Sequence, residues 1–171
     1  MRSNFDKYPS IKVSENNDDC ITGWSSIATT INGTIAAKGK KRVVVVIDCY
    51  QGVYEEVETI LRKELNYNLF VRSTTAFKAP KSIEAMVYPD VTDDQIFGFM
   101  TRLTIGRFFD DEKLSSLRKE IEGTTEGVVV VYGEGAAYVA SQSDLLINLE
   151  MARWEIQLLM RRGKVNNLGV K

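Results

Sequence analysis

Two uninterrupted runs of β-branched residues constrain the fold of this chain more than any other feature of its sequence. They are "RVVVVID" at residues 42–48 and "GVVVVY" at residues 127–132. A strand with one face in water alternates apolar and polar side chains, whereas these runs are apolar at consecutive positions. Such runs are typical of central strands in a parallel sheet with helices on both faces. We therefore expect the two runs to lie side by side, so that Asp48 and Gly133 leave the sheet into one shared cleft.

Segments with helical spacing of apolar residues separate the expected strands. Two further strands are predicted at "LFVRST" and "SDLLINLE". Helices are predicted over residues 24–38, 57–66, 80–88, 93–103, 110–123 and 151–163, with a short helix after the glycine turn that begins at Gly133. Alternating strands and helices predict an α/β fold: a three-layer, mostly parallel sheet with helices on both faces, of the P-loop NTPase or Rossmann kind.

The chain is organised as residues 1–20, a polar arm interrupted by Pro9, and residues 21–171, a single α/β domain. The arm holds at most a short strand at "SIKV", and no internal repeat or long linker is present. No apolar run approaches the ~20 residues that cross a bilayer, and the first residues lack the apolar centre of a secretory signal. A cytoplasmic location is therefore expected.

The composition excludes several kinds of chemistry. The sequence contains no histidine, which excludes a Ser-His-Asp triad and any histidine-ligated metal site, and we assign no metal ligands. A net charge of −1 without a basic block argues against nucleic-acid binding. Cys20 and Cys49 are too few for a disulfide framework, so both are expected to be reduced thiols.

Two loops at the ends of the valine runs are candidate binding sites, because ligands of parallel sheets bind beyond the carboxyl ends of the strands. The first, "DCYQG", supplies the cleft candidates Asp48, Gln51 and Gly52. Its alternative interpretation is an ordinary turn in which Asp48 caps the helix that follows.

The second loop, "YGEGAA", has the glycine spacing of a phosphate cradle. Gly133, Gly135 and the amide of Ala136 are the candidate phosphate-binding groups. The lysine and hydroxyl of G-x-x-x-x-G-K-[ST] are missing, since two alanines follow the second glycine. Glu134 would also repel an anion, so a purely structural turn is the favoured alternative.

Arginines supply the remaining candidates. Arg153 and Arg161 lie on one stripe of the last predicted helix and are joined by Arg162 at its end, so they form either a phosphate clamp or an ordinary solvated face. Trp154 is expected on the opposite, core-facing side. Arg102 lies among four phenylalanines in "IFGFMTRLTIGRFF"; we expect core packing with Arg102 or Arg107 paired to an aspartate, or else a partner-docking surface or pocket wall.

Several segments together resemble a known family: "KYP", "VVIDCYQGV", "YPDVTDDQIFGFMTRLT", "VVVYGEGAA" and "DLLINLEMARWEIQLLMRRGKVNNLGV". They are similar to the N-terminal region of some Bacteroidetes class I mannose-6-phosphate isomerases. The resemblance implies that a metal-dependent cupin isomerase region follows this domain. That region's zinc ligands include histidines, so none is carried onto this chain, and this chain would not form the isomerase active site.

The last of these segments also resembles the late strand and lid helix of P-loop nucleoside kinases. This resemblance implies that Arg153, Arg161 and Arg162 occupy phosphate-clamping positions and that "YGEGAA" is a phosphate loop without its lysine. A kinase lacking that lysine loses its main stabilisation of transition-state charge.

These observations predict a non-catalytic, P-loop-kinase-like domain associated with mannose-6-phosphate isomerase, which binds a nucleotide or sugar phosphate or packs against the isomerase domain. The alternatives are an active magnesium-dependent phosphotransferase and an oligomerisation module. The candidate cofactor is a nucleotide with magnesium. The expected partners are the isomerase domain or a small phosphorylated ligand, with a homo-oligomer as a further alternative and with neither nucleic acid nor membrane.

Overall fold

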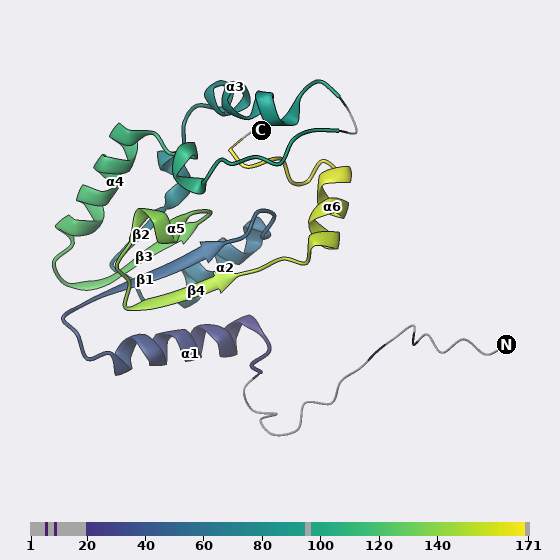
Figure 1. The fold of residues 1–171 in the computed structure, drawn as a ribbon. Helices are drawn as coiled ribbons and strands as arrows, with labels where there is room; N and C mark the ends of the chain where they lie inside the picture. Colours follow the sequence, from purple (N-terminus) through teal and green to yellow (C-terminus); the bar gives the residue numbers. More distant parts are fainter. Residues whose placement is uncertain (1–5, 7–8, 10–19, 95–96, 170–171) are drawn as a thin grey trace.

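The computed structural model describes residues 6, 9, 20–94 and 97–169 (Figure 1). The short strand expected at residues 10–13 lies outside the described residues. The elements are α1 Trp24–Ala37, β1 Arg42–Cys49, α2 Glu55–Glu64, β2 Leu69–Arg72, η1 Ser73–Ala76, α3 Pro80–Val91, η2 Ile105–Phe108, α4 Asp111–Gly123, β3 Gly127–Gly133, α5 Ala136–Val139, β4 Leu145–Leu149 and α6 Arg153–Arg161.

The four strands form one all-parallel sheet in the order β2-β3-β1-β4. The two valine runs are β1 and β3, and they are neighbours at the centre, with Val45 opposite Val130. Asp48 lies directly opposite Gly133 in the same register, so the two exits converge as the sequence predicts.

Helices cover both faces of the sheet, which gives the predicted three-layer α/β architecture (Figure 1). Val43, Val45 and Ile47 of β1 pack with α1 and α2 on one face. Val44 and Val46 pack with α3, α4 and α5 on the other. Because successive side chains of a strand point to opposite faces, only a continuous apolar run can fill both cores at once.

The connections place a topological switch point between β1 and β3. The chain leaves β1 through α2 toward β2, whereas it leaves β3 through α5 toward β4 on the other side of β1. Adjacent strands whose connections part in opposite directions open a crevice at their carboxyl ends, where ligands of α/β sheets bind. The fold thus favours a site beyond Asp48 and Gly133.

The helix expected over residues 93–103 is wrong for the described part of that segment, because residues 97–104 have no helical structure. The preceding helix α3 ends at Thr92, which has a positive φ of 62°. The amide of Phe97 donates to Asp94 Oδ1, and the amide of Phe99 donates to the carbonyl of Asp90. The second bond holds the chain back against α3, because the Phe99 amide donates to a carbonyl of α3 instead of to one within a new helix.

Within the described part of the chain, no helix combines the length and the apolar character that crossing a bilayer requires.

Candidate functional site

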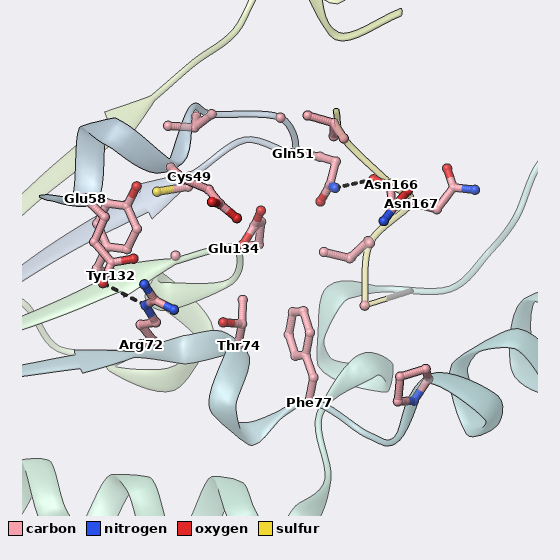
Figure 2. A pocket seen from close by; sticks show the side chains of 18 of the residues that line it. Cys49, Gln51, Glu58, Arg72, Thr74, Phe77, Tyr132, Glu134, Asn166 and Asn167 are labelled. Atoms are coloured by element: carbon pink, nitrogen blue, oxygen red, sulfur yellow. Dashed lines mark hydrogen bonds and ion pairs between the residues drawn. The ribbon is translucent and has the colours of Figure 1, made fainter. Parts of the chain in front are cut away.

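A cavity of about 510 Å³ opens at the carboxyl ends of β1, β2 and β3 (Figure 2). Its wall is built by the loop between β1 and α2, the first turn of α2, the segment from Arg72 to Pro80, the end of β3 and residues 164–169. Residues 164–169 follow α6 and run back across the top of the sheet toward α3 (Figure 1). The cavity therefore lies where the topology places a ligand site.

The predicted cleft residues divide into those that line the cavity and those that support it. Gln51, Gly52 and Gly133 line the wall, whereas Asp48 lies behind it. Asp48 Oδ1 accepts a hydrogen bond from the amide of Gly135 at 3.0 Å, and Oδ2 accepts one from the amide of Ala137 at 3.3 Å. Asp48 thus holds the turn after β3.

This arrangement corrects the alternative interpretation of Asp48. The helix that follows its own strand, α2, has Tyr54 at its N-cap and no side-chain cap, so Asp48 does not cap it. Instead the carboxylate occupies the amide of Gly135, a predicted phosphate-binding group, and the amide of Ala137 in the same turn. Any anion at those amides would compete with a carboxylate already hydrogen-bonded to them.

The glycines of the same turn have close neighbours inside the protein. Gly133 has φ 119°, and a Cβ there would lie 2.7 Å from Ser73 Oγ. Gly135 has φ 70°, and a Cβ there would lie 2.8 Å from the side chain of Ile105. Positive φ and close packing each require glycine here, whatever the turn binds. The phosphate-binding roles of Gly133, Gly135 and Ala136 remain predictions.

The loop after β1 also has the strand, glycine turn and helix order of a phosphate loop. Gly52 has φ 96° and packs against Ile156 of α6. Val53 and Tyr54 follow Gly52, where a phosphate loop has its lysine and its hydroxyl. The first turn of α2 carries three glutamates, which already complement the positive end of the helix dipole. Neither glycine loop therefore contains the side chains of a phosphotransferase.

Charged groups of both signs line the cavity. Glu58 is buried, and its Oε1 accepts hydrogen bonds from Arg62 Nε and Arg72 Nε at 2.7 Å each. The hydrogen bond to Glu58 raises the pKa of Arg72. Lys78 and Lys164 add two further cations to the wall, and Lys78 Nζ donates to the carbonyl of Arg107 at 2.8 Å.

Two acceptor groups on the wall are incompletely paired within the described residues. Gln51 Nε2 donates to the carbonyl of Asn166 at 2.6 Å, which leaves Gln51 Oε1 buried and without a hydrogen-bond partner. The Glu134 carboxyl has no cation paired with it in the described chain. Burial raises its pKa, and repulsion from Asp48 adds to the increase. Both groups line the same cavity.

Cys49 and Tyr132 form an unreactive part of the wall. Burial raises the pKa of the Cys49 thiol to about 12, and burial also raises the pKa of Tyr132. A thiol with so high a pKa carries almost no thiolate, the form that acts as nucleophile. Both cysteines are free thiols, as the sequence predicts.

The arginines of α6 lie apart from the cavity. Arg153, Arg161 and Arg162 are exposed, and none of them lines its wall. The expectation that Trp154 faces the core is wrong: the side chain is 62% exposed and lies beneath the guanidinium of Arg161. The short helix α6 buries Ile156 and Leu159 instead, because it packs on the β1–α2 loop rather than on the sheet. The clamp role of the three arginines stays a prediction.

A second, shallower groove of about 680 Å³ lies along the segment after α3. Arg102 and Arg107 line it together with Phe99 and Met100. The four phenylalanines of this region divide: Phe109 is buried in the core, whereas Phe97 and Phe99 are more than 70% exposed. Core packing of the whole segment is therefore wrong, and an exposed aromatic surface remains.

A family model described as a domain of unknown function (DUF8485) matches residues 23–171. The chain belongs to this family. Neither the curated proteins nor the solved structures gave a match to this DUF8485 domain. The family match carries no activity of its own, so a function for the DUF8485 domain has to rest on its geometry.

The described part of the DUF8485 domain has no group of three or more acidic or cysteine side chains placed to hold a metal ion. Sequence reasoning also missed part of the cavity wall, namely Thr74, Phe77, Lys78 and residues 164–169. The polar pair Asn166 and Asn167 directly after an amphipathic helix is the one local signal that could have indicated a return toward the site. Glu134 was visible in the sequence, but we interpreted it only as repelling phosphate.

Proposed function

We propose that this DUF8485 domain is a non-catalytic relative of the P-loop kinases. It binds a small phosphorylated ligand in the cavity beyond β1, β2 and β3, and it acts beside a mannose-6-phosphate isomerase. The observation that carries the proposal is a polar cavity at the switch point of a parallel sheet whose two glycine loops both lack the catalytic lysine. The association with the isomerase rests on the sequence resemblance.

The charges of the wall support a phosphorylated ligand. Arg72 and Lys78 come from the segment between Arg72 and Pro80, Lys164 comes from the segment after α6, and all three line the cavity. Glu58 already pairs with Arg72, so the two lysines are the cations of the wall left for a phosphate. A mobile ammonium group binds phosphate as a point charge without the fixed geometry of a catalytic loop. This composition suits binding better than transition-state stabilisation.

The absence of phosphotransfer follows from the same two loops. Val53 and Tyr54 stand in one loop, and Ala136 and Ala137 in the other, where lysine and hydroxyl would be needed. Asp48 occupies the backbone amides of the second loop. Without a lysine at the phosphates, the usual route to phosphoryl transfer loses its main electrostatic contribution.

Thermal unfolding with a panel of phosphorylated ligands tests the proposal. The panel contains ATP, GTP, three hexose 6-phosphates and inorganic phosphate, each with and without magnesium. A bound ligand at 100 times its Kd adds about 2.7 kcal/mol of stability. We expect stabilisation by at least one phosphorylated ligand, with no release or transfer of its phosphate. Turnover would support the phosphotransferase alternative, and the lack of any shift would exclude ligand binding.

Matched variants locate the phosphate. Lys78→Ala and Lys164→Ala are expected to weaken binding, because both side chains line the cavity. Arg153→Ala and Arg161→Ala are the controls, since both side chains lie outside the wall. Lys164→Ala is the more informative of the first pair, because Lys78 also bonds to the carbonyl of Arg107. Loss of binding only in Arg153→Ala and Arg161→Ala would place the phosphate at the arginines of α6 and contradict phosphate binding in the cavity.

A second candidate function, docking to another protein domain, is favoured by the exposed residues of the segment after α3. Phe97, Phe99 and Met100 are 73%, 74% and 96% exposed, and hydrogen bonds to α3 and to Asp94 hold the segment in place. Apolar patches of this kind mark interaction surfaces. Size-exclusion chromatography with light scattering would detect a homo-oligomer. The double substitution Phe97→Ser and Phe99→Ser should dissociate this oligomer. If the unsubstituted protein is a monomer at all concentrations, self-association is excluded.

A further inference from the structure

We propose that the part of the cavity between Gln51 and Glu134 binds the hydroxyl groups of a sugar phosphate. The inference rests on the proposed function, because it names the ligand class of the same cavity. Two acceptor groups carry it: Gln51 Oε1, which has no donor, and the Glu134 carboxyl, with which no cation is paired in the described chain. Each is held in place by other contacts.

The Gln51 side-chain amide has only one orientation that suits its surroundings. Nε2 donates to the carbonyl of Asn166 at 2.6 Å, and the opposite orientation would bring two acceptor oxygens together. Oε1 is therefore the atom left over, buried and without a partner in the described structure. A buried acceptor without a donor costs free energy, and a ligand that supplies a donor recovers it.

Glu134 is positioned by its backbone. Its carbonyl accepts a hydrogen bond from Ser73 Oγ at 2.8 Å, which joins the turn after β3 to the end of β2. Figure 2 shows Glu134 and Gln51 on one side of the cavity, opposite Thr74 and Phe77. The raised pKa of Glu134 reflects burial and the nearby Asp48, and its own backbone amide compensates the ionised form only in part. A hydroxyl donor would compensate it.

The chemistry of these groups selects among phosphorylated ligands. A phosphate monoester is mostly a dianion at neutral pH and its oxygens then only accept, so the phosphate group of such a ligand has no favourable place between an amide oxygen and a carboxylate. A sugar hydroxyl donates to either group and accepts from another donor, which Thr74 and Asn167 on the same wall can supply. The phosphate would lie at Lys78 and Lys164. The cavity volume of about 510 Å³ lies within the ~300–1,000 Å³ typical of small-molecule pockets, and a hexose phosphate is a ligand of that class.

Calorimetric titration separates hydroxyl recognition from phosphate recognition. The titrants are mannose 6-phosphate, glucose 6-phosphate, fructose 6-phosphate, ATP and inorganic phosphate. We expect at least one hexose phosphate to bind about tenfold or more tightly than inorganic phosphate, because a site built to pair hydroxyl groups rejects a ligand without the sugar. It should also bind more tightly than ATP, whose ribose offers fewer hydroxyl groups than a hexose. Deoxy analogues of the best hexose phosphate should lose affinity at the positions that face Gln51 and Glu134.

Two substitutions test the acceptors directly. Glu134→Gln should stabilise the unliganded domain, since it removes a partly buried charge close to Asp48, and should weaken the best hexose phosphate about tenfold while inorganic phosphate changes by less than about twofold. Gln51→Met keeps the length of the side chain and should weaken the best hexose phosphate in the same way. Because it also removes the bond to the carbonyl of Asn166, it should not stabilise the unliganded domain. Glu122→Gln, on the exposed side of α4, is the matched control and should change neither quantity.

The outcomes distinguish this inference from the proposed function. If no phosphorylated ligand binds, both fail. If inorganic phosphate binds as tightly as every hexose phosphate, the cavity binds phosphate and hydroxyl recognition is wrong. If ATP does so, the assignment of a sugar phosphate is wrong. Unchanged hexose phosphate affinity in both Glu134→Gln and Gln51→Met overturns the inference even where ligand binding stands. If one variant fails to fold, the other still decides, because the two acceptors belong to different loops.

Discussion

Replacement of Asp48 by alanine tests how the two central loops are held together. The carboxylate accepts hydrogen bonds from two backbone amides of the turn after β3, at 3.0 and 3.3 Å. Asp48→Ala removes both bonds and leaves the amides of Gly135, which is buried, and Ala137 without their acceptor. The substitution leaves the valine cores untouched, so its effect isolates the loop contact.

The magnitude follows from the two bonds. A hydrogen bond to a charged group contributes about 1.5–3 kcal/mol. The bond at 3.3 Å is longer than the usual range for an N–H donor, so it counts for less than the first. We therefore expect Asp48→Ala to lower the free energy of unfolding by about 2–4 kcal/mol. Asp48→Asn keeps one acceptor oxygen and should cost about half as much.

Urea denaturation at neutral pH measures this loss as a shift of the midpoint at constant m-value. Asp111→Ala is the control, because Asp111 is an exposed acidic residue in the first turn of α4 and should cost no more than about 1 kcal/mol. A change below about 0.5 kcal/mol for Asp48→Ala, the size of an ordinary surface substitution, would show that the carboxylate does not hold the turn.

Three further outcomes are expected. Glu134 has a native pKa above its ordinary value of 4.5, so its contribution to stability is present in full below that pH and is lost as pH rises through the native pKa. Glu134→Gln should therefore raise the free energy of unfolding at neutral pH and make it depend less on pH in that window. Chemical denaturation of both proteins across the window checks this, and an equal pH dependence of the wild type and the variant would contradict it. Gly133→Ala should cost about 1–3 kcal/mol by thermal or chemical unfolding, because φ is 119° and Ser73 Oγ is 2.7 Å from the added methyl; a neutral effect would mean that the turn relaxes freely. Glu58→Gln should cost about 1–3 kcal/mol, since the buried carboxylate loses its charge-assisted bonds to two arginines, and Arg72→Gln in a double-mutant cycle should recover part of that loss as coupling energy.

The architecture was predictable because few folds can bury two continuous valine runs. Residues 42–48 and 127–132 are apolar toward both faces, which places them at the centre of a parallel sheet and brings Asp48 opposite Gly133. The helix expected over residues 93–103 was wrong for its described part because the amide of Phe99 bonds to the carbonyl of Asp90, and the chain returns along α3. The spacing of apolar residues in a segment does not indicate that the chain turns back along a preceding helix.

The candidate site was predictable only in outline. The convergence of Gln51, Gly52 and Gly133 follows from parallel topology, since these residues end adjacent strands. The contribution of residues 164–169 does not, because it depends on the direction in which the chain leaves α6. The exposure of Trp154 was missed for a related reason: helical spacing indicates two faces but not which of them a short peripheral helix buries.

The bond between Asp48 and the turn after β3 has a consequence for any attempt to give this domain kinase chemistry. The backbone amides that would receive a substrate's negative charge already hold a carboxylate from the neighbouring strand. A lysine engineered after Gly135 would meet that carboxylate before it met a nucleotide, and would be neutralised by it. Engineered phosphotransfer would therefore need two changes together: the removal of the Asp48 carboxylate from one loop and the addition of a lysine to the other.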